Sequence, residues 1–237
     1  MMAIKVAENK MLATPDGPEV TSILVQPDDA IALMVLGHGS GTPILRPHMV
    51  QLCEALAGQG IATFRYNYPY SEGMTIYSPN MIDPLDVLLA TTNSAKKVAE
   101  SLAPDLPLFL GGRSMSSQVV SLALTKESWP NVRGVVLYVF PMRWRYLLDD
   151  TVGHLRDVPL LMLFVQGGRD EEYADLTELQ RVLDGLEERT TLHVVEGANH
   201  FYGLPSESGR TRDDALAEVA TVTAAWICRQ LGSEPSS

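Results

Sequence analysis

Short apolar runs recur along the chain, each followed by glycine or polar residues and then by a segment with helical spacing. Continuous runs of about six apolar residues are typical of strands buried on both faces of a parallel sheet. Such runs predict strands at residues 31–36, 61–66, 106–110, 135–140, 160–165 and 190–195. Residues 20–25 instead alternate as an antiparallel strand does.

Apolar positions at helical spacing predict helices between these strands. They occur around Met49–Leu56, over 85–102, over 118–124, and in a C-terminal helix that Thr211 caps and that turns Val219, Val222 and Trp226 inward. Strands that alternate with helices predict an α/β fold with a doubly wound, mainly parallel sheet. Because there is no linker or repeat, we expect one domain over residues 1–237, with 232–237 as a frayed tail.

Composition narrows the class of protein. The chain has 237 residues, of which 46% are hydrophobic and 20% charged, as in ordinary globular proteins. A net charge of -11 argues against nucleic acid as a partner. No apolar segment is long enough to span a membrane, and early charges argue against a signal peptide. We therefore expect a cytoplasmic protein in which Cys53 and Cys228 are buried thiols.

Ser114 follows the strand predicted at 106–110 and precedes a helix. Small residues, Gly112 and Ser116, stand two positions away on each side. This pattern is typical of a nucleophile elbow, in which a sharp strand-to-helix turn presents one side chain. The helix would also direct the backbone N–H of Met115 at a developing negative charge. The alternative is that Ser114 only caps the helix.

Three residues capable of acyl-transfer chemistry follow the ends of different predicted strands. Ser114, Asp170 and His200 occur in this order, which is that of α/β-hydrolases. Since the carboxyl ends of parallel strands meet at one edge, we expect a nucleophile, an acid and a base there. The acid has competitors in Asp149, Asp150, Asp157 and Asp175. The backbone of Ser40 could supply a second oxyanion donor, with His38 shaping that loop.

Candidate substrate-binding residues are Tyr70, Met142 and Trp144, although Tyr70 could equally lie in the core. Arg113 could pair with a buried carboxylate or face the substrate. The segment 141–158 is too short for a cap domain but could wall the site, which favours small substrates. No Gly-x-Gly-x-x-Gly motif and no Cys/His cluster is present, so we expect neither cofactor nor metal.

Five stretches resemble the α/β-hydrolase superfamily: 38–41, 64–70, 112–116, 165–170 and 197–201. They are most similar to the capless group related to testis-expressed protein 30 and to dienelactone-hydrolase-like serine hydrolases. The resemblance implies an α/β-hydrolase fold without a cap. Two departures are Ser116, where glycine is usual, and residues 140–145, which lack a His-Pro-Pro-Gly-like run.

The sequence therefore predicts a cofactor-independent serine hydrolase, most simply a carboxylesterase that acts on small soluble acyl esters. Two alternatives stay open. One is a thioesterase, and the other is an α/β-hydrolase fold used for interaction without catalysis.

Overall fold

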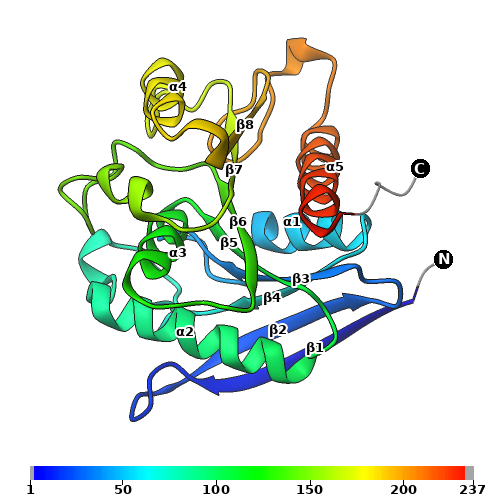
Figure 1. Ribbon diagram of the computed structural model, residues 1–237, viewed down its shortest axis with the longest axis vertical. Helices are drawn as coiled ribbons and strands as arrows, with labels where there is room; N and C mark the ends of the chain where they lie inside the picture. Colours follow the sequence, from blue (N-terminus) through cyan, green and yellow to red (C-terminus); the bar gives the residue numbers. More distant parts are fainter. Residues whose placement is uncertain (1–2, 233–237) are drawn as a thin grey trace.

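A computed structural model describes residues 3–232 and places eight strands in one sheet, in the order β1-β2-β4-β3-β5-β6-β7-β8 (Figure 1). The strands are β1 (Ile4–Leu12), β2 (Glu19–Pro27), β3 (Ala32–Gly37), β4 (Ile61–Tyr66), β5 (Leu108–Arg113), β6 (Val132–Tyr138), β7 (Met162–Gly167) and β8 (Thr190–Val195). Among these strands of the described chain, β1–β2 and β2–β4 are the antiparallel pairs and the other neighbours are parallel. The expected mainly parallel sheet is confirmed.

Strand β1 is not predicted by the sequence pattern, because Lys5, Glu8 and Lys10 interrupt its apolar residues. It is an edge strand that pairs only with β2, and most of its residues are exposed. Charged residues on an edge strand discourage pairing with another chain. The polar pattern therefore reflects the place of β1 in the sheet.

Several strand ends differ from the expected ones. Strand β5 begins at Leu108 and continues through two glycines to Arg113. The glycines belong to the strand because the backbone is packed closely there: a Cβ on Gly111 would lie 2.6 Å from the sulfur of Met34. Strand β6 starts earlier than expected and ends at Tyr138, since Val139 leaves the strand with a φ of +47°.

Helices cover both faces of the sheet (Figure 1). Helices α1 (Pro47–Ala57) and α5 (Arg212–Leu231) pack together on one face, and α2 (Leu85–Leu102) and α3 (Met115–Lys126) pack together on the other. Helix α4 (Leu176–Asp184), which the sequence analysis does not predict, packs beside β8. Thr211 caps α5 as expected and forms a capping box with Asp214. The predicted tail lies outside the described residues from 233 onward.

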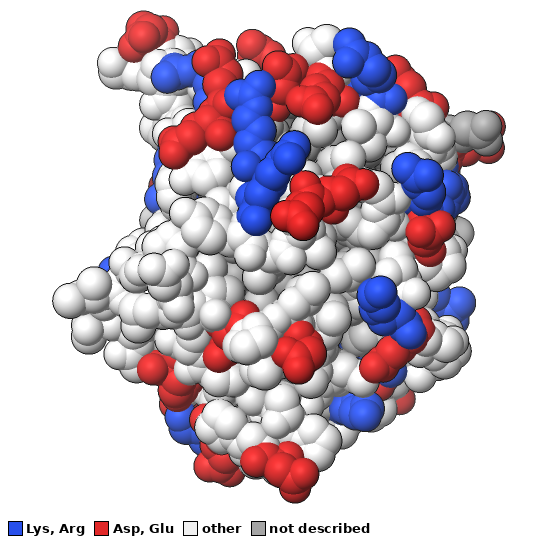
Figure 2. All heavy atoms as spheres, turned by 90° about the vertical axis from the view of Figure 1, so that its left-hand side faces the viewer, with Lys and Arg blue, Asp and Glu red and all other residues white. Residues whose placement is uncertain are grey.

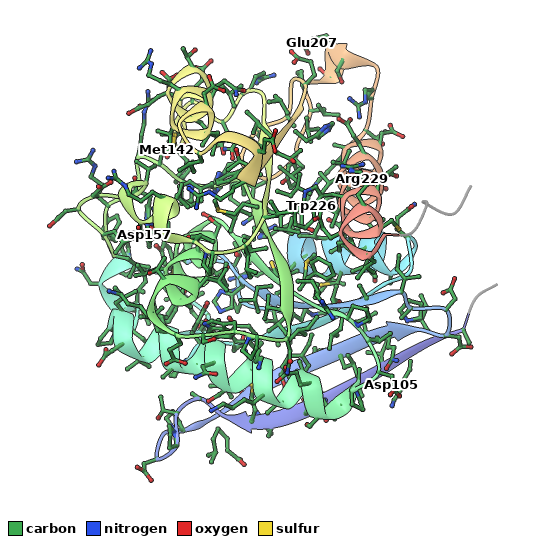
Figure 3. The ribbon with its side chains drawn as sticks, in the orientation of Figure 1. Asp105, Met142, Asp157, Glu207, Trp226 and Arg229 are labelled. Carbon is green, nitrogen blue, oxygen red and sulfur yellow. The ribbon has the colours of Figure 1, made fainter. Side chains whose placement is uncertain are left out.

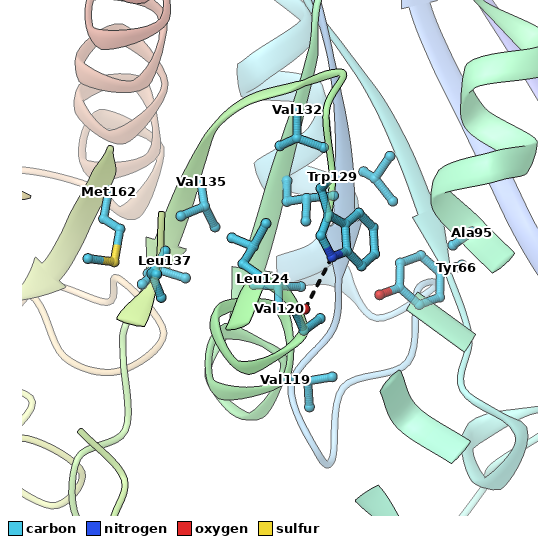
Figure 4. Packing of buried hydrophobic residues seen from close by; sticks show 14 of the residues in the cluster. Tyr66, Ala95, Val119, Val120, Leu124, Trp129, Val132, Val135, Leu137 and Met162 are labelled. Carbon is cyan, nitrogen blue, oxygen red and sulfur yellow. Dashed lines mark hydrogen bonds between the residues drawn. The ribbon is translucent and has the colours of Figure 1, made fainter. Parts of the chain in front are cut away.

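Each face of the sheet has its own hydrophobic core. On the side of α2 and α3, Trp129 is buried and its Nε1 donates to the carbonyl oxygen of Ala123 at 3.1 Å (Figure 4). On the other side, Trp226 points from α5 toward the sheet (Figure 3). Gly134 leaves room for it, because a Cβ there would lie 2.6 Å from the indole ring. Cys53 is buried in this second core and Cys228 is buried on α5, as predicted for both.

The loops at the carboxyl ends of the parallel strands frame the candidate site. Between β6 and β7, residues 139–161 contain a short 3-10 helix, Gly153–Asp157, and no inserted domain. No helix within residues 3–232 is long and apolar enough to cross a membrane.

Candidate active site

Ser114 occupies the turn between β5 and α3. It has a φ of 53° and a ψ of −121°, a conformation that costs free energy for a residue with a side chain. A Cβ on Gly112 would lie 2.4 Å from the carbonyl oxygen of Ser116, so the turn requires glycine there. The N–H of Ser114 donates to the carbonyl oxygen of Tyr138 at 2.9 Å, which ties the turn to β6. The chain thus holds Ser114 in the strained position that an elbow needs.

Ser116 stands where the resembling family usually has glycine, and the structure accommodates it. Its Oγ accepts from the N–H of Arg113 at 2.9 Å and is 3.2 Å from the carbonyl oxygen of the same residue. The space for this side chain comes from the neighbouring strand, because a Cβ on Gly37 would lie only 2.6 Å from the Cβ of Ser116. The departure therefore leaves the turn intact.

The loops after β7 and β8 bring Asp170 and His200 to Ser114. The Nε2 of His200 lies 2.8 Å from the Oγ of Ser114, and its Nδ1 lies 2.8 Å from the Oδ2 of Asp170. A carboxylate can only accept, so Nδ1–H donates to Asp170 and Nε2 accepts from the serine hydroxyl. Exposed fractions of 8% for Ser114, 3% for Asp170 and 6% for His200 keep the arrangement largely out of water.

The competing aspartates lie elsewhere. Asp149, Asp150 and Asp157 are exposed. Asp150 accepts from the backbone N–H groups of Val152 and Gly153. Asp175 caps α4 through the N–H groups of its first turn. The structure therefore brings Asp170 alone among them to His200.

A residue that the sequence analysis missed helps to hold Asp170. The Nε2 of Gln166, at the end of β7, donates to the Oδ2 of Asp170 at 2.8 Å and is itself buried. The available signal is that Gln166 directly follows the apolar run predicted at 160–165, at the carboxyl end of the strand. The bond fixes the carboxylate oxygen that faces His200.

Burial sets the protonation of the pair. It lowers the pKa of His200 below the ordinary 6.5, although the hydrogen bond to Asp170 works in the opposite direction. It also raises the pKa of Asp170, which the hydrogen bond from His200 opposes. A neutral imidazole at neutral pH is the form that can accept a proton from Ser114.

Of the two roles left open for Arg113, pairing with a carboxylate is not seen among residues 3–232, whereas part of the residue does line the cleft beside Ser114. Its guanidinium is buried and donates to the carbonyl oxygen of His200 at 2.8 Å, and it lies 4.9 Å from the ring centre of Phe201. Burial lowers its pKa to about 10, so it stays charged at neutral pH. The residue before Ser114 therefore anchors the loop that carries His200.

The loop after β3 lies against Ser114, since a Cβ on Gly39 would be 3.3 Å from the serine Cβ. The backbone N–H groups of Ser40 and Met115 have no hydrogen-bond acceptor among residues 3–232. Ser40 lines the same cleft as Ser114, and Met115 begins α3. Both N–H groups are therefore available to an oxygen bound beside Ser114.

His38 shapes this loop from beneath. Its Nδ1 donates to the carbonyl oxygen of Gly39 at 2.7 Å, so its Nε2 is an acceptor. The Nε2 accepts from the N–H of Tyr68 at 3.3 Å and lies 2.9 Å from the hydroxyl of Ser71. Complete burial lowers its pKa to about 4, which keeps it neutral. The expectation that His38 is a hydrogen-bonded part of the loop agrees with this arrangement.

Two of the expected substrate-binding residues have other places. The hydroxyl of Tyr70 donates to the carbonyl oxygen of Ser40 at 2.8 Å and lies 3.6 Å from the sulfur of Met115, so it supports the oxyanion loop. Met142 is 4% exposed and packs in the core on the side of α3 (Figure 3). Tyr70 lies in a short 3-10 helix, Pro69–Ser71, and Met142 in a loop, and the sequence pattern does not fix the side-chain direction in either. Trp144 does line the cleft above Ser114.

The remaining histidines lie outside the arrangement. His193 pairs with Glu218, His154 with Ser121, and His48 packs against the ring of Phe201. Within the described residues, no group of three or more His, Cys, Asp or Glu side chains could hold a metal ion.

Ser114 and His200 open onto a cleft of about 490 Å³. Its walls come from the loops after β3, β4, β6, β7 and β8, including aromatic residues at 77, 144, 146, 173 and 201. The ring of Tyr173 stacks on the imidazole of His200, with ring centres 4.1 Å apart. A serine, a neutral imidazole and free backbone donors in one cleft can carry out nucleophilic acyl transfer.

Most of the chain matches a known protein family. Residues 30–228 match the family model described as an alpha/beta hydrolase domain. No curated protein matches the chain.

Solved structures with low sequence identity share the fold. One is a dienelactone hydrolase from Anabaena variabilis, at 18% identity and a TM-score of 0.72 over 95% of this chain and 98% of that one. A serine hydrolase without a lid from Xanthomonas campestris has 18% identity and a TM-score of 0.69 over 98% and 97%. A cold-adapted esterase from an Arctic intertidal metagenomic library has 17% identity and a TM-score of 0.70 over 94% of each chain.

Proposed function

Because the chain belongs to the α/β-hydrolase family, we propose that it is a serine hydrolase that cleaves small carboxylic esters through Ser114, His200 and Asp170. The observation that carries this proposal is the pair of 2.8 Å contacts that link the serine hydroxyl to the imidazole and the imidazole to the carboxylate. The strained backbone of Ser114 supports it, since a serine that only caps a helix needs no such conformation.

In the first half of the reaction, the Oγ of Ser114 attacks the ester carbonyl carbon while its proton passes to the Nε2 of His200. The carbonyl oxygen becomes an oxyanion that accepts from the backbone N–H groups of Ser40 and Met115. When the oxyanion collapses, the bond to the alcohol oxygen breaks and His200 gives the proton to that oxygen. The products are the free alcohol and an acyl ester on Ser114.

In the second half, a water molecule attacks the acyl carbon and gives its proton to His200. Collapse of the second oxyanion releases the carboxylic acid, and the proton returns to the Oγ of Ser114. Throughout, Asp170 holds the neutral imidazole in the correct tautomer and stabilises the imidazolium when it forms. Gln166 holds Asp170, and Arg113 holds the backbone of His200.

The proposal is tested by labelling the wild-type protein and Ser114→Ala with a fluorophosphonate probe and by measuring hydrolysis of p-nitrophenyl acetate. We expect labelling of the wild type alone and a loss of turnover on the order of 10⁴- to 10⁶-fold in the variant. Thermal unfolding of both proteins checks that the variant is folded. An unlabelled, inactive wild-type protein would favour an interaction protein without catalysis, and equal labelling of both would move the nucleophile elsewhere.

A further inference from the structure

The cleft beside Ser114 has an unusual lining. Its apolar side chains are proline and five aromatic rings, those of Tyr77, Trp144, Tyr146, Tyr173 and Phe201. In the described part of the chain, no Leu, Ile, Val or Met side chain lines this cleft. The aliphatic residues lie instead in the two cores beneath it.

The exposed aromatic residues of the molecule gather at the same place. Tyr77, Tyr146 and Phe201 are 36%, 61% and 40% exposed, and no other aromatic residue within residues 3–232 is exposed to this degree. All three line the cleft. Exposing large rings to water without a ligand is unfavourable, so their concentration at the reactive serine points to a bound group that covers them.

The rings come from separate loops and surround the reacting groups. Tyr77 follows β4 and lies over Gly41, where a Cβ would be 3.2 Å from its ring. Trp144 and Tyr146 follow β6, with ring centres 5.2 Å apart and planes at 43°. Phe201 packs edge-on against the imidazole of His200 at 5.6 Å. A flat group bound above Ser114 would therefore meet ring faces and edges.

Charge in the cleft favours a neutral ligand. Outside the reacting groups, Glu172 and Arg113 are the charged residues of its lining. Glu172 is exposed at the rim and would repel an anion, while Arg113 is buried and donates to the backbone of His200. The face that Figure 2 shows has an area of uncharged side chains at its left and centre, with charged groups above it, to its right and below it.

Resting on the proposed function, we propose that the preferred substrates are neutral esters that carry an aromatic ring, bound against the rings of Tyr77, Trp144 and Tyr146. Aromatic pairs gain free energy beyond the burial of their area, through offset or edge-to-face contacts that an aliphatic group cannot make. The ring can belong to the acid or to the alcohol part of the ester, and the two arms of the test distinguish these cases.

The test compares phenyl with cyclohexyl esters. In one arm the ring is on the acid, with methyl 3-phenylpropanoate against methyl 3-cyclohexylpropanoate. In the other it is on the alcohol, with 2-phenylethyl acetate against 2-cyclohexylethyl acetate. Cyclohexyl exposes at least as much apolar area, so simple burial predicts a kcat/KM ratio of phenyl to cyclohexyl of one or below. We expect a ratio of roughly 3 to 10 in at least one arm, from ring contacts.

Variants identify the rings that produce the preference. Tyr146→Leu should lower the phenyl-to-cyclohexyl ratio toward one, whereas Tyr146→Phe, which keeps the ring, should preserve it. Tyr77→Leu supplies a second case on another loop. Each ratio is taken within one protein, so a partly unfolded variant does not affect it.

Ratios of one or below in both arms, with ester hydrolysis intact, would overturn the aromatic preference and leave the proposed function standing. The preference for neutral esters would be overturned if an analogue of methyl 3-phenylpropanoate that carries a carboxylate had a higher kcat/KM than methyl 3-phenylpropanoate itself. No hydrolysis of any of these esters, together with no fluorophosphonate labelling, would overturn the proposed function itself.

Discussion

The guanidinium of Arg113 donates to the main-chain oxygen of His200 at 2.8 Å, so the residue before the nucleophile holds the residue that takes its proton. The two are 87 positions apart in the chain. The contact joins the end of β5 to the loop after β8, and both residues are buried. It makes the position of the imidazole depend on the same turn that positions Ser114.

This contact gives a prediction about Arg113 as a positioning residue. Arg113→Met should lower kcat/KM by about 10- to 100-fold, since a buried hydrogen bond to a charged group contributes about 1.5–3 kcal/mol. Its positive charge also lowers the pKa of His200. Removing the charge should therefore raise that pKa, so that the acid limb of the pH–kcat/KM profile moves to higher pH.

Arg113→Lys provides the control for this effect. It keeps the charge but loses the planar donor geometry, so kcat/KM should fall with little movement of the acid limb. In the wild type, this limb should lie below pH 6.5, because burial lowers the pKa of His200 from that value and activity requires the neutral imidazole. An unmoved limb in Arg113→Met would limit the residue to a structural role.

Asp170→Asn should lower turnover by roughly 10⁴-fold. The amide can donate to Nδ1 and would stabilise the wrong imidazole tautomer, while the shape of the side chain is kept. Steady-state hydrolysis of p-nitrophenyl acetate measures the loss, and circular dichroism checks the fold. Asp175→Asn serves as a matched control, because Asp175 caps α4 and does not contact His200. Near-normal activity of Asp170→Asn would assign the acid to another residue.

The sequence could predict the three reacting residues because topology alone brings them together. Ser114, Asp170 and His200 each follow a parallel strand, and the carboxyl ends of such strands share one edge. It could not place Tyr70 or Met142, because one lies in a short 3-10 helix and the other in a loop, where spacing does not fix the direction of a side chain. The role of Arg113 was equally hidden, since its partner is a backbone oxygen on another loop.

The sequence pattern also failed to predict strand ends and the edge strand. Strand β1 was missed because an edge strand is mostly exposed and lacks the apolar run of a buried one. The apolar pattern predicts that β5 ends before its glycines, although both lie inside the strand, where Gly111 packs closely against Met34 and Gly112 against the backbone of Ser116. In both cases the residue type at a position is determined by contacts with a neighbouring element, and the local hydrophobic pattern does not show this.

The pairing of Gly37 with Ser116 gives a prediction about stability. Gly37→Ala should lower the free energy of unfolding by about 1–3 kcal/mol, since its Cβ would lie 2.6 Å from that of Ser116. The double variant Gly37→Ala, Ser116→Gly should recover part of this loss, because the clash with Ser116 is removed while a contact of 3.1 Å with the hydroxyl of Tyr68 remains. Urea unfolding of the two single variants and the double variant measures the coupling. Additive losses would show that the two positions do not share the same space.

The last prediction concerns the length of the acyl chain. The cleft holds about 490 Å³, and the 139–161 segment supplies Trp144 and Tyr146 to one wall without an inserted domain to enclose a tunnel. Each methylene that leaves water adds about 0.8 kcal/mol, but only while the walls still cover it. In a ladder of p-nitrophenyl esters below their micelle concentrations, kcat/KM should therefore rise over the short acyl chains, about two to six carbons, and then stop rising. The proline and aromatic lining strengthens this expectation, because rings set at different angles leave no continuous channel for a flexible chain. An efficiency that still increases at twelve carbons would require a long apolar channel, formed by movement of the 139–161 segment or by a partner that covers the cleft.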